Sequence, residues 1–245
     1  MNFKTLIKRP DAYAKVACLK VINLMRSKIY KGNAVVCDIC KWKGKQFFKG
    51  KCPNCNSLPR TRLIPFSLRH FKIIEGELKI LHIAPNLNEY HYILNNFVAI
   101  KKYDRLNIKR AFPHINLVQD ITQSDIKDET YELVIVWHVF EHIVEDVSAA
   151  LEIYRILKPN GNLLMSVPIY PVRSETTFED PSIKYEDYEE IHGHDDHCRS
   201  CGLDYCKRFE TVGFNTKTLM NYSENEIKQF GLSKNHVAWC FNKKE

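Results

Sequence analysis

Two pairs of cysteines near the start of the chain have the spacing of a metal site. Cys37 and Cys40 form one C-x-x-C pair, Cys52 and Cys55 form another, and eleven residues separate them. Each pair can occupy a tight turn that presents two thiolates to one tetrahedral ion. Four thiolates leave no coordination position open, so we predict a structural Zn²⁺ rather than a catalytic one. Basic neighbours can offset the negative charge of such a site: Lys41, Lys43, Lys51, Arg60 and Arg62.

A second group of metal-capable side chains lies in the segment "HGHDDHCRSCGLDYC". It contains His192, His194, His197, Cys198, Cys201 and Cys206. The segment lacks two clean cysteine turns, so a second metal site and a polar active-site loop both remain open.

Candidate cofactor-binding residues stand at the ends of the strand-like runs in the middle of the chain. They are His82, Ala84 and Pro85 after the first run, Asp104 after the second, Asp120 and Ile121 after the third, and His138 after the fourth. Ligands of open α/β sheets bind at the carboxyl ends of the strands, so we predict a cofactor site there. Asp104 could accept hydrogen bonds from ribose hydroxyls, and Asp120 from an adenine amino group with Ile121 beside the ring. A solvated turn residue at 104 and a cap at 120 are the alternatives.

Candidates for acid–base work cluster in two places. His138, Glu141 and His142 follow the fourth run, whereas Asp196 and His197 lie in the loop after the fifth run, as does Asp180. A general base helps only if the acceptor of the reaction must lose a proton. Glu141 and His142 could equally well begin a helix, and Asp180 before Pro181 could only fix a turn.

Alternating periodicities from residue 78 onward predict the elements that position these side chains. Strand-like runs occur at 78–83, 97–103, 115–119, 132–137 and 162–168, and helix-like runs at 87–95, 145–157 and 203–212. This alternation predicts a parallel sheet covered on both faces. The tail "NHVAWCFNKKE" predicts a last strand, antiparallel and at or near the sheet edge.

The first part of the chain differs from the rest in charge. Residues 1–72 hold 17 Lys and Arg against Asp11 and Asp38, or +15, and the remainder is −8, which together give the net +7. A polyanion is a natural partner for such a segment. We predict a basic N-terminal helix in 1–33, a Cys₄ zinc ribbon in 34–58 and an α/β domain in 59–245.

The helix expected over residues 10–30 carries an apolar stripe. Its members are Ala14, Cys18, Val21, Ile22, Met25 and Ile29. Such a stripe usually packs on a core, and the alternative is a basic amphipathic helix on a membrane surface or a nucleic acid. No apolar run reaches the length of a membrane span, and no export signal is evident, so we expect a cytoplasmic protein with reduced thiols.

Two segments resemble the class I S-adenosylmethionine-dependent methyltransferases: "LVQDITQSDIKDETYELVIVWHVFEHI" and "EIYRILKPNGNLLMSVPI". Four others resemble a methyltransferase type 11-like subgroup with an N-terminal zinc ribbon: "CPNCNSLPRTRLIPFSL", "LHIAP", "TFEDPSIKYEDYEEIHGHDDHCR" and "DYCKRFETVGF". The resemblance implies a Rossmann-like seven-stranded methyltransferase sheet with one antiparallel strand. It also implies that S-adenosyl-L-methionine binds at the ends of strands one to four.

The chain departs from the superfamily pattern at the first turn, where "HIAPNLNE" replaces the usual glycine-rich motif. It also has Cys198 and Cys201 where the subgroup more often has an aliphatic and an aromatic residue. The missing glycines are tolerable for this donor, because S-adenosylmethionine has no phosphates and needs no cradle of backbone amides.

The sequence therefore predicts an S-adenosylmethionine-dependent methyltransferase that acts by in-line displacement on an unidentified acceptor, which could be a small molecule, a sugar or lipid-linked glycan, or an RNA. The alternative is a catalytically degenerate methyltransferase fold that binds nucleic acid through its zinc ribbon. Docking to a membrane surface through residues 10–30 is a third hypothesis.

Overall fold

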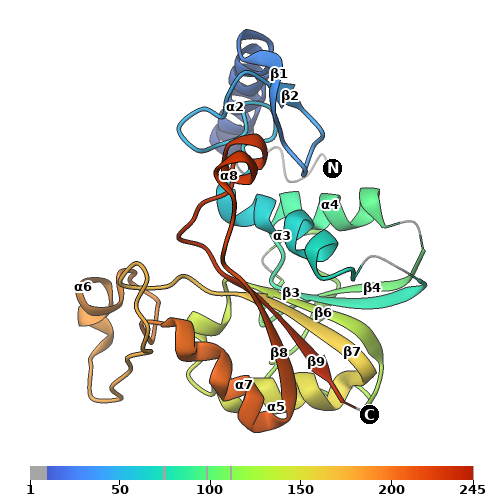
Figure 1. Ribbon diagram of the computed structural model, residues 1–245, viewed down its shortest axis with the longest axis vertical. Coiled ribbons are helices and arrows are strands. Elements are labelled where there is room, and N and C mark those ends of the chain that lie inside the picture. The colour runs from blue at the N-terminus through green and yellow to red at the C-terminus, as the bar shows by residue number, and fades with distance from the viewer. Residues whose placement is uncertain (1–9, 74–75, 98, 111, 245) are drawn as a thin grey trace. The chain divides into compact units, whose positions relative to one another are not determined.

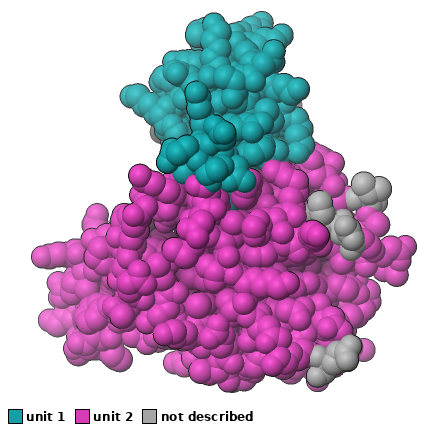
Figure 2. Space-filling model, in the orientation of Figure 1, with its two compact units in different colours: residues 1–63, 223–232 teal, residues 64–222, 233–245 magenta. Residues whose placement is uncertain are grey.

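Two compact units make up the chain, and each is described by itself (Figure 2). The computed structural model describes residues 10–73, 76–97, 99–110 and 112–244, without the side chains of residues 10–17. Unit 1 comprises residues 1–63 and 223–232, and unit 2 comprises residues 64–222 and 233–245. The predicted boundaries of the N-terminal helix, the ribbon and the α/β domain stay a prediction.

Unit 1 is built around a short two-stranded sheet. Its elements are α2 (Pro10–Ile29), β1 (Lys31–Val36), β2 (Lys43–Gly44), the first residues of α3 (Pro59–His70) and α8 (Glu224–Phe230). β1 and β2 pair antiparallel, with Val36 opposite Lys43. Ser223 and Glu226 form a capping box that starts α8.

Aromatic rings fill the small interior of this unit. The Trp42 indole donates from Nε1 to the Ser27 carbonyl at 3.1 Å, and its ring centroid lies 6.4 Å from that of Phe47. A Cβ on Gly44 would stand 1.9 Å from the Trp42 ring, so only glycine fits there. The indole thereby ties β2 to the end of α2.

The apolar stripe expected on α2 is largely open to solvent. Val21, Met25 and Ile29 are each more than half exposed, and Cys18 is exposed as well, while the side chain of Ala14 lies outside the described residues. The helix forms at the predicted position, but unit 1 does not bury the stripe.

Arg62 is the central polar residue of unit 1. It is fully buried, and its guanidinium lies over the Phe47 ring at 4.1 Å. It donates to four backbone carbonyls: those of Ser57, Gly50 (2.8 Å), Phe230 (3.0 Å) and Gly231 (2.6 Å). Burial lowers the pKa of Arg62, while the neighbouring cysteines act in the opposite direction. This one side chain therefore joins the second cysteine pair to α3 and α8.

Unit 2 contains a seven-stranded sheet with the order β5-β4-β3-β6-β7-β9-β8. The strands are β3 (Leu78–Ile83), β4 (Ile100–Asn107), β5 (Leu117–Val118), β6 (Tyr131–Trp137), β7 (Leu157–Ser166), β8 (Phe214–Leu219) and β9 (Ala238–Lys243). β3 to β7 are parallel, and β9 runs antiparallel to both of its neighbours. The predicted methyltransferase-type sheet with one antiparallel strand is confirmed, and that strand lies one position in from the edge.

Helices cover both faces of this sheet (Figure 1). α4 (Leu87–Asn96) lies on one face, and α5 (Asp146–Ile156) and α7 (Lys207–Val212) lie together on the other. Three short 3₁₀ turns, η1 (Phe140–His142), η2 (Tyr185–Asp187) and η3 (Leu203–Cys206), and one short helix, α6 (Tyr188–His192), complete the unit. The core of unit 2 is apolar, and Leu81, Val134, Leu164 and Trp239 in it are completely buried.

Besides the run 115–119, which is observed as the shorter β5 (Leu117–Val118), two predicted strands differ from the observed ones at their ends. The run 97–103 is observed as β4 (Ile100–Asn107), so Asp104 lies inside a strand and Asn107 stands at its carboxyl end. The run 162–168 belongs to β7, which begins at Leu157 and accommodates the Pro159–Gly161 segment as an irregularity in its pairing with β6. Both differences arise because the partner strands, rather than local turn residues, decide how far a strand extends.

No helix among the described residues is long and apolar enough to cross a membrane.

The substitution Arg62→Met should lower the stability of unit 1 rather than that of unit 2. Methionine keeps the bulk but leaves buried carbonyl oxygens without donors, which we expect to cost about 3 kcal/mol or more. That loss corresponds to roughly a hundredfold faster exchange of the buried amides of residues 37–57, measured by hydrogen exchange and mass spectrometry. Arg60→Met changes an exposed arginine on the same helix and should leave exchange unchanged. Equal exchange in the two variants would contradict the role given to Arg62.

Candidate active site and cysteine cluster

The four predicted metal-ligating cysteines converge in unit 1 on two equivalent turns. The amide of Cys37 donates to the Trp42 carbonyl at 2.8 Å, and that of Cys52 donates to the Ser57 carbonyl at 3.0 Å. Each turn ends in a non-glycine residue with a left-handed backbone, Lys41 (φ 60°) or Asn56 (φ 61°). The repeated geometry aims both pairs of sulfurs at one point.

The sulfur separations fit a tetrahedral zinc. Sγ of Cys37 lies 3.7 Å from Sγ of Cys55, and Sγ of Cys40 lies 3.7 Å from Sγ of Cys52. Two sulfurs at the usual Zn–S distance of about 2.3 Å would be about 3.8 Å apart. The ligand atoms of all four residues lie within 4.8 Å of one another. Asn54 also donates to Sγ of Cys40 at 3.3 Å, which suits a thiolate.

A cavity of about 510 Å³ lies in unit 2 at the carboxyl ends of β3 to β6. Its wall contains four of the predicted cofactor-binding residues, Ala84, Asp120, Ile121 and His138. It also contains three of the predicted catalytic residues, His138 again, His142 and Asp196. Asn107, Gln119 and Ile143 also line it and were not predicted. Asn107 could have been found only by placing the end of β4 correctly.

Two residues of this wall have left-handed backbones at the ends of adjacent strands. Ala84 follows β3 with φ 49°, and its amide donates to the Leu106 carbonyl at 2.7 Å. His138 follows β6 with φ 55°, and its amide donates to the Ser166 carbonyl at 2.8 Å. Such conformations cost about 1–2 kcal/mol for a residue with a side chain. The turn geometry that usually requires glycine is therefore present here without one.

His82 and Pro85 lie beneath the first turn and do not line the cavity. His82 is completely buried, its Nδ1 is 3.1 Å from the Tyr103 hydroxyl, and burial followed by the charge of His114 lowers its pKa to about 3. The Pro85 carbonyl accepts from Nε2 of His114 at 2.8 Å. His82 is thus a neutral core residue, and its predicted donor contact stays a prediction.

Asp104 lies inside β4 and is held by side chains of β4, of β6 and of the segment before β5. Its carboxylate accepts from the Tyr131 hydroxyl at 2.6 Å and from Asn116 at 3.2 Å, and it pairs with Lys102 at 2.7 Å. Burial alone would raise the pKa of Asp104, but the bonds from Lys102 and Tyr131 outweigh burial and lower it. The structure does not bring this residue to the cavity wall, and its predicted ribose contact stays a prediction.

Asp120 both lines the cavity and caps a turn, which are the two alternatives that the sequence left open. It lies in the cavity wall, and its Oδ1 accepts from the Thr122 amide (2.9 Å) and hydroxyl (2.8 Å) in a turn. Ile121 beside it is buried and contributes apolar surface.

Glu141, His142, Asp196 and His197 come together beside His138. Nδ1 of His142 is 3.0 Å from the Asp196 carbonyl, and its Nε2 is 3.7 Å from Oε1 of Glu141. The rings of His142 and His197 are 4.8 Å apart. Burial lowers the pKa of His197. The five predicted catalytic residues therefore form one cluster, although only three of them line the cavity.

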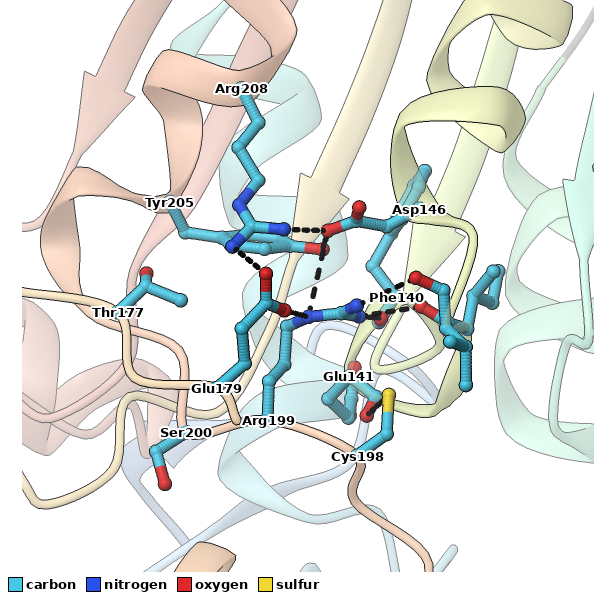
Figure 3. Close-up of polar contacts among 12 residues, drawn as sticks. Phe140, Glu141, Asp146, Thr177, Glu179, Cys198, Arg199, Ser200, Tyr205 and Arg208 are labelled. Carbon is cyan, nitrogen blue, oxygen red and sulfur yellow. Dashed lines mark hydrogen bonds and ion pairs between the residues drawn. The ribbon is translucent and has the colours of Figure 1, made fainter. Parts of the chain in front are cut away.

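Arg199 holds the two segments that supply this cluster (Figure 3). Its guanidinium is buried and donates to the carbonyls of Phe140 (2.8 Å), Ile143 (2.6 Å) and Val144 (3.0 Å). Its Nε donates to Glu179 at 2.7 Å. The adjacent Cys198 amide donates to the Glu141 carbonyl at 2.9 Å. The loop after β7 is thereby fastened to the turn after β6.

A second arginine completes this clamp. Arg208 donates to Asp146 at 2.9 Å and to Glu179 at 2.6 Å, and the Tyr205 hydroxyl donates to Asp146 at 2.7 Å (Figure 3). Burial alone would raise the pKa of Glu179, but hydrogen bonds from Arg208 and Arg199 hold it below its usual value. Sequence reasoning missed the clamp, because its members are separated by up to 62 residues.

Only part of the histidine- and cysteine-rich segment is gathered into groups of side chains that could hold a metal ion. Cys201 is buried in the hydrophobic core, and Nδ1 of His192 bonds the Ser200 hydroxyl at 2.9 Å. Of its six candidates, only His194 and His197 belong to groups of metal-capable side chains in the described part of the chain. Asp180 accepts from Ser182 in an exposed turn.

Comparison with known proteins assigns this architecture to methyltransferases. Residues 89–165 match the family described as a methyltransferase domain. The S-adenosylmethionine-dependent methyltransferase of Mesorhizobium loti has a similar structure, with a TM-score of 0.53 and 9% identity over 72% of this chain and 95% of that one. That of Archaeoglobus fulgidus gives a TM-score of 0.52 and 14% identity over 75% and 94% of the two chains. A search of curated proteins found no match.

Glu179→Gln should weaken unit 2 in a pH-dependent way. Because the folded pKa of Glu179 is depressed, its stabilisation is complete above its usual pKa near 4.5 and is lost as the pH falls through the folded value. The variant should be less stable than the parent by about 1 kcal/mol at pH 6, allowing for partial exposure, and the gap should close towards pH 3.

Urea unfolding at several pH values measures this gap. Glu175→Gln alters an exposed carboxylate of the same loop and should show no such gap. A gap for Glu179→Gln that does not change with pH would mean that the lost bonds, and not the charge, carry the effect.

Proposed function

We propose that the cavity at the ends of β3 to β6 binds S-adenosylmethionine and that the adjoining cluster faces the acceptor, since residues 89–165 match a methyltransferase-domain family and the fold is shared with S-adenosylmethionine-dependent methyltransferases. The observation that carries the proposal is the composition of the cavity wall. It combines Asp120 and Ile121 at the third strand end with the left-handed turns of Ala84 and His138. This arrangement matches the region where open α/β sheets bind ligands.

Each part of the wall suits a different part of the donor. Asp120 can accept from the adenine amino group, and Ile121 can flank the ring. The side-chain amide of Asn107, at the end of β4, can form hydrogen bonds with the ribose hydroxyls. The sequence predicted this role for Asp104. The left-handed turn at Ala84 keeps the chain close to β4, which leaves room for the donor's amino-acid end without a glycine.

The sulfonium of S-adenosylmethionine supplies a methyl group that is already activated for in-line displacement. The protein's task is then to align the acceptor and to exclude water. His138 stands at the end of β6 with its ring 6.3 Å from that of His236, and its Nε2 is buried without a hydrogen-bond partner among the described residues. We propose that this nitrogen faces the acceptor and takes its proton where the acceptor must lose one.

We propose that the Cys₄ cluster binds a structural Zn²⁺, since its sulfur separations and the Asn54 amide that donates to Sγ of Cys40 fit that ion. Four thiolates and Zn²⁺ carry a net −2, and the buried Arg62 lies beside them. A reducing compartment such as the cytoplasm suits these thiolates. Exposed lysines on unit 1, including Lys43, Lys45 and Lys49, favour contact with a polyanion, which fits an RNA acceptor better than a neutral one.

Titration with S-adenosylhomocysteine tests the donor site. The parent should bind with one site per chain, and Asp120→Ala should weaken binding about tenfold, the equivalent of one charge-assisted hydrogen bond. Asp125→Ala lies in the same connection but outside the cavity wall and should bind like the parent. Absence of binding in folded, zinc-loaded protein would overturn the proposal in favour of a nucleic-acid-binding protein with a degenerate methyltransferase fold.

Zinc content tests the cysteine cluster. Purified parent protein should hold zinc, whereas Cys40→Ser and Cys52→Ser should each lose one zinc per chain, measured by atomic emission. Loss of the ion should also unfold unit 1, because such sites contribute folding energy. Cys206→Ser removes a thiol outside the cluster and should keep the zinc. Full zinc retention in Cys40→Ser would refute the assignment.

A further inference from the structure

His142 is held in an orientation that leaves one of its ring nitrogens without a hydrogen, so that its lone pair is free to bind a ligand. Its Nδ1 lies 3.0 Å from the Asp196 carbonyl oxygen and 3.2 Å from Oδ1 of the same residue. Both neighbours are acceptors, so Nδ1 must carry a hydrogen. In a neutral imidazole Nε2 then has none, and it lies 3.7 Å from Oε1 of Glu141, which is another acceptor. Two acceptors therefore face each other across a short gap.

Glu141 makes this gap costly to leave unfilled. Its side chain is only 2% exposed, and Oε2 has no hydrogen-bond partner among the described residues. Its other oxygen lies 3.6 Å from Nδ1 of His138, too far for a hydrogen bond. A buried carboxylate with so few partners requires a positive charge nearby.

His197 adds a third donor atom from the opposite loop. The ligand atoms of Glu141, His142 and His197 all lie within 4.8 Å of one another, and those of His194, Asp196 and His197 do so as well. Ligands on a tetrahedral ion at about 2 Å are about 3.3 Å apart, so a small contraction of the cluster would suffice. The Asp196 carbonyl on Nδ1 of His142 is the outer partner that metal-bound histidines usually have.

We propose that Glu141, His142 and His197 bind a divalent first-row transition-metal ion. Two imidazoles and one carboxylate suit Mn²⁺, Fe²⁺, Co²⁺ or Zn²⁺ better than Ca²⁺ or Mg²⁺. Three protein ligands leave coordination positions open, unlike the closed Cys₄ site. His142 also lines the proposed donor cavity, so the open side of the ion is directed to the acceptor's place. An acceptor with an oxygen ligand would bind there, and this last step alone rests on the proposed function.

Mn²⁺ is the probe that separates this site from the cysteines, because thiolate sites select softer ions. Untagged full-length protein that holds one zinc per chain, the amount the cysteines account for, is titrated with Mn²⁺, and free Mn²⁺ is followed by electron paramagnetic resonance. One Mn²⁺ per chain is expected to bind to the parent. His197→Ala, which changes a half-buried residue, and Glu141→Gln should each raise the Kd at least tenfold.

His91→Ala is the matched control, because His91 is an exposed histidine outside the cluster. It should bind like the parent. Absence of Mn²⁺ binding to the parent would overturn the proposal. Equal Mn²⁺ affinity in His197→Ala, confirmed as folded by near-ultraviolet circular dichroism, would also overturn it.

Titration with S-adenosylhomocysteine on the same samples keeps the two proposals apart. Mn²⁺ binding without donor binding would remove the proposed function and leave the metal site. Donor binding without Mn²⁺ binding would do the reverse.

Discussion

A buried guanidinium determines where the candidate active site forms. Arg199 is only 3% exposed, and a cation at that depth must be matched by acceptors. Three carbonyls around η1 and the carboxylate of Glu179 provide them. The carbonyls belong to the turn after β6, whereas the guanidinium belongs to the loop after β7. The cost of leaving the charge unmatched therefore locks the two segments together, and with them the histidines and carboxylates that they carry.

The left-handed residues show how the chain keeps its turn geometry without the usual glycines. Ala84 and His138 both leave parallel strands of the same sheet, and each amide is bonded to the carbonyl of a neighbouring segment. Those bonds offset the cost of the strained backbone. Such conformations persist where the surrounding structure holds them in place, and they are concentrated in functional regions. Asn86 then starts α4 through a capping box with Glu89, so the polar side chain of the first turn is used for the helix. The missing glycines therefore reflect a different way of building the same turn.

The sequence predicted the fold better than the site, for identifiable reasons. Strand β3 was found with its observed bounds, because Leu78–Ile83 is an apolar run that ends before a turn. The end of β4 was misplaced, because Tyr103, Asp104 and Arg105 continue a strand that no local pattern marks. The cysteine cluster could be predicted because its ligands lie within 19 residues of one another.

The clamp around Arg199 had no comparable local signal. Its partners come from three different connections, and a charged residue looks the same in a sequence whether it is buried or solvated. Only the fold reveals that Asp146, Glu179 and Arg199 meet. The cluster of Glu141, His142 and His197 depends on the same meeting, so a search within one segment does not find Glu141 and His142 as neighbours of His197.

Charge around the proposed donor cavity has a consequence for catalysis. S-adenosylmethionine carries a sulfonium charge that is lost on methyl transfer, whereas Asp120 and Asp196 line the cavity and Glu141 lies behind His142. Negative groups that attract the bound cation stabilise the ground state more than the transition state, and so they raise the barrier. Asp120 makes two local hydrogen bonds, which disperse its charge. A metal ion bound at Glu141, as proposed above, would reduce the remaining attraction where the transfer occurs. Hence an ion that neutralises the charge of Glu141 also affects how tightly the donor is held before it reacts.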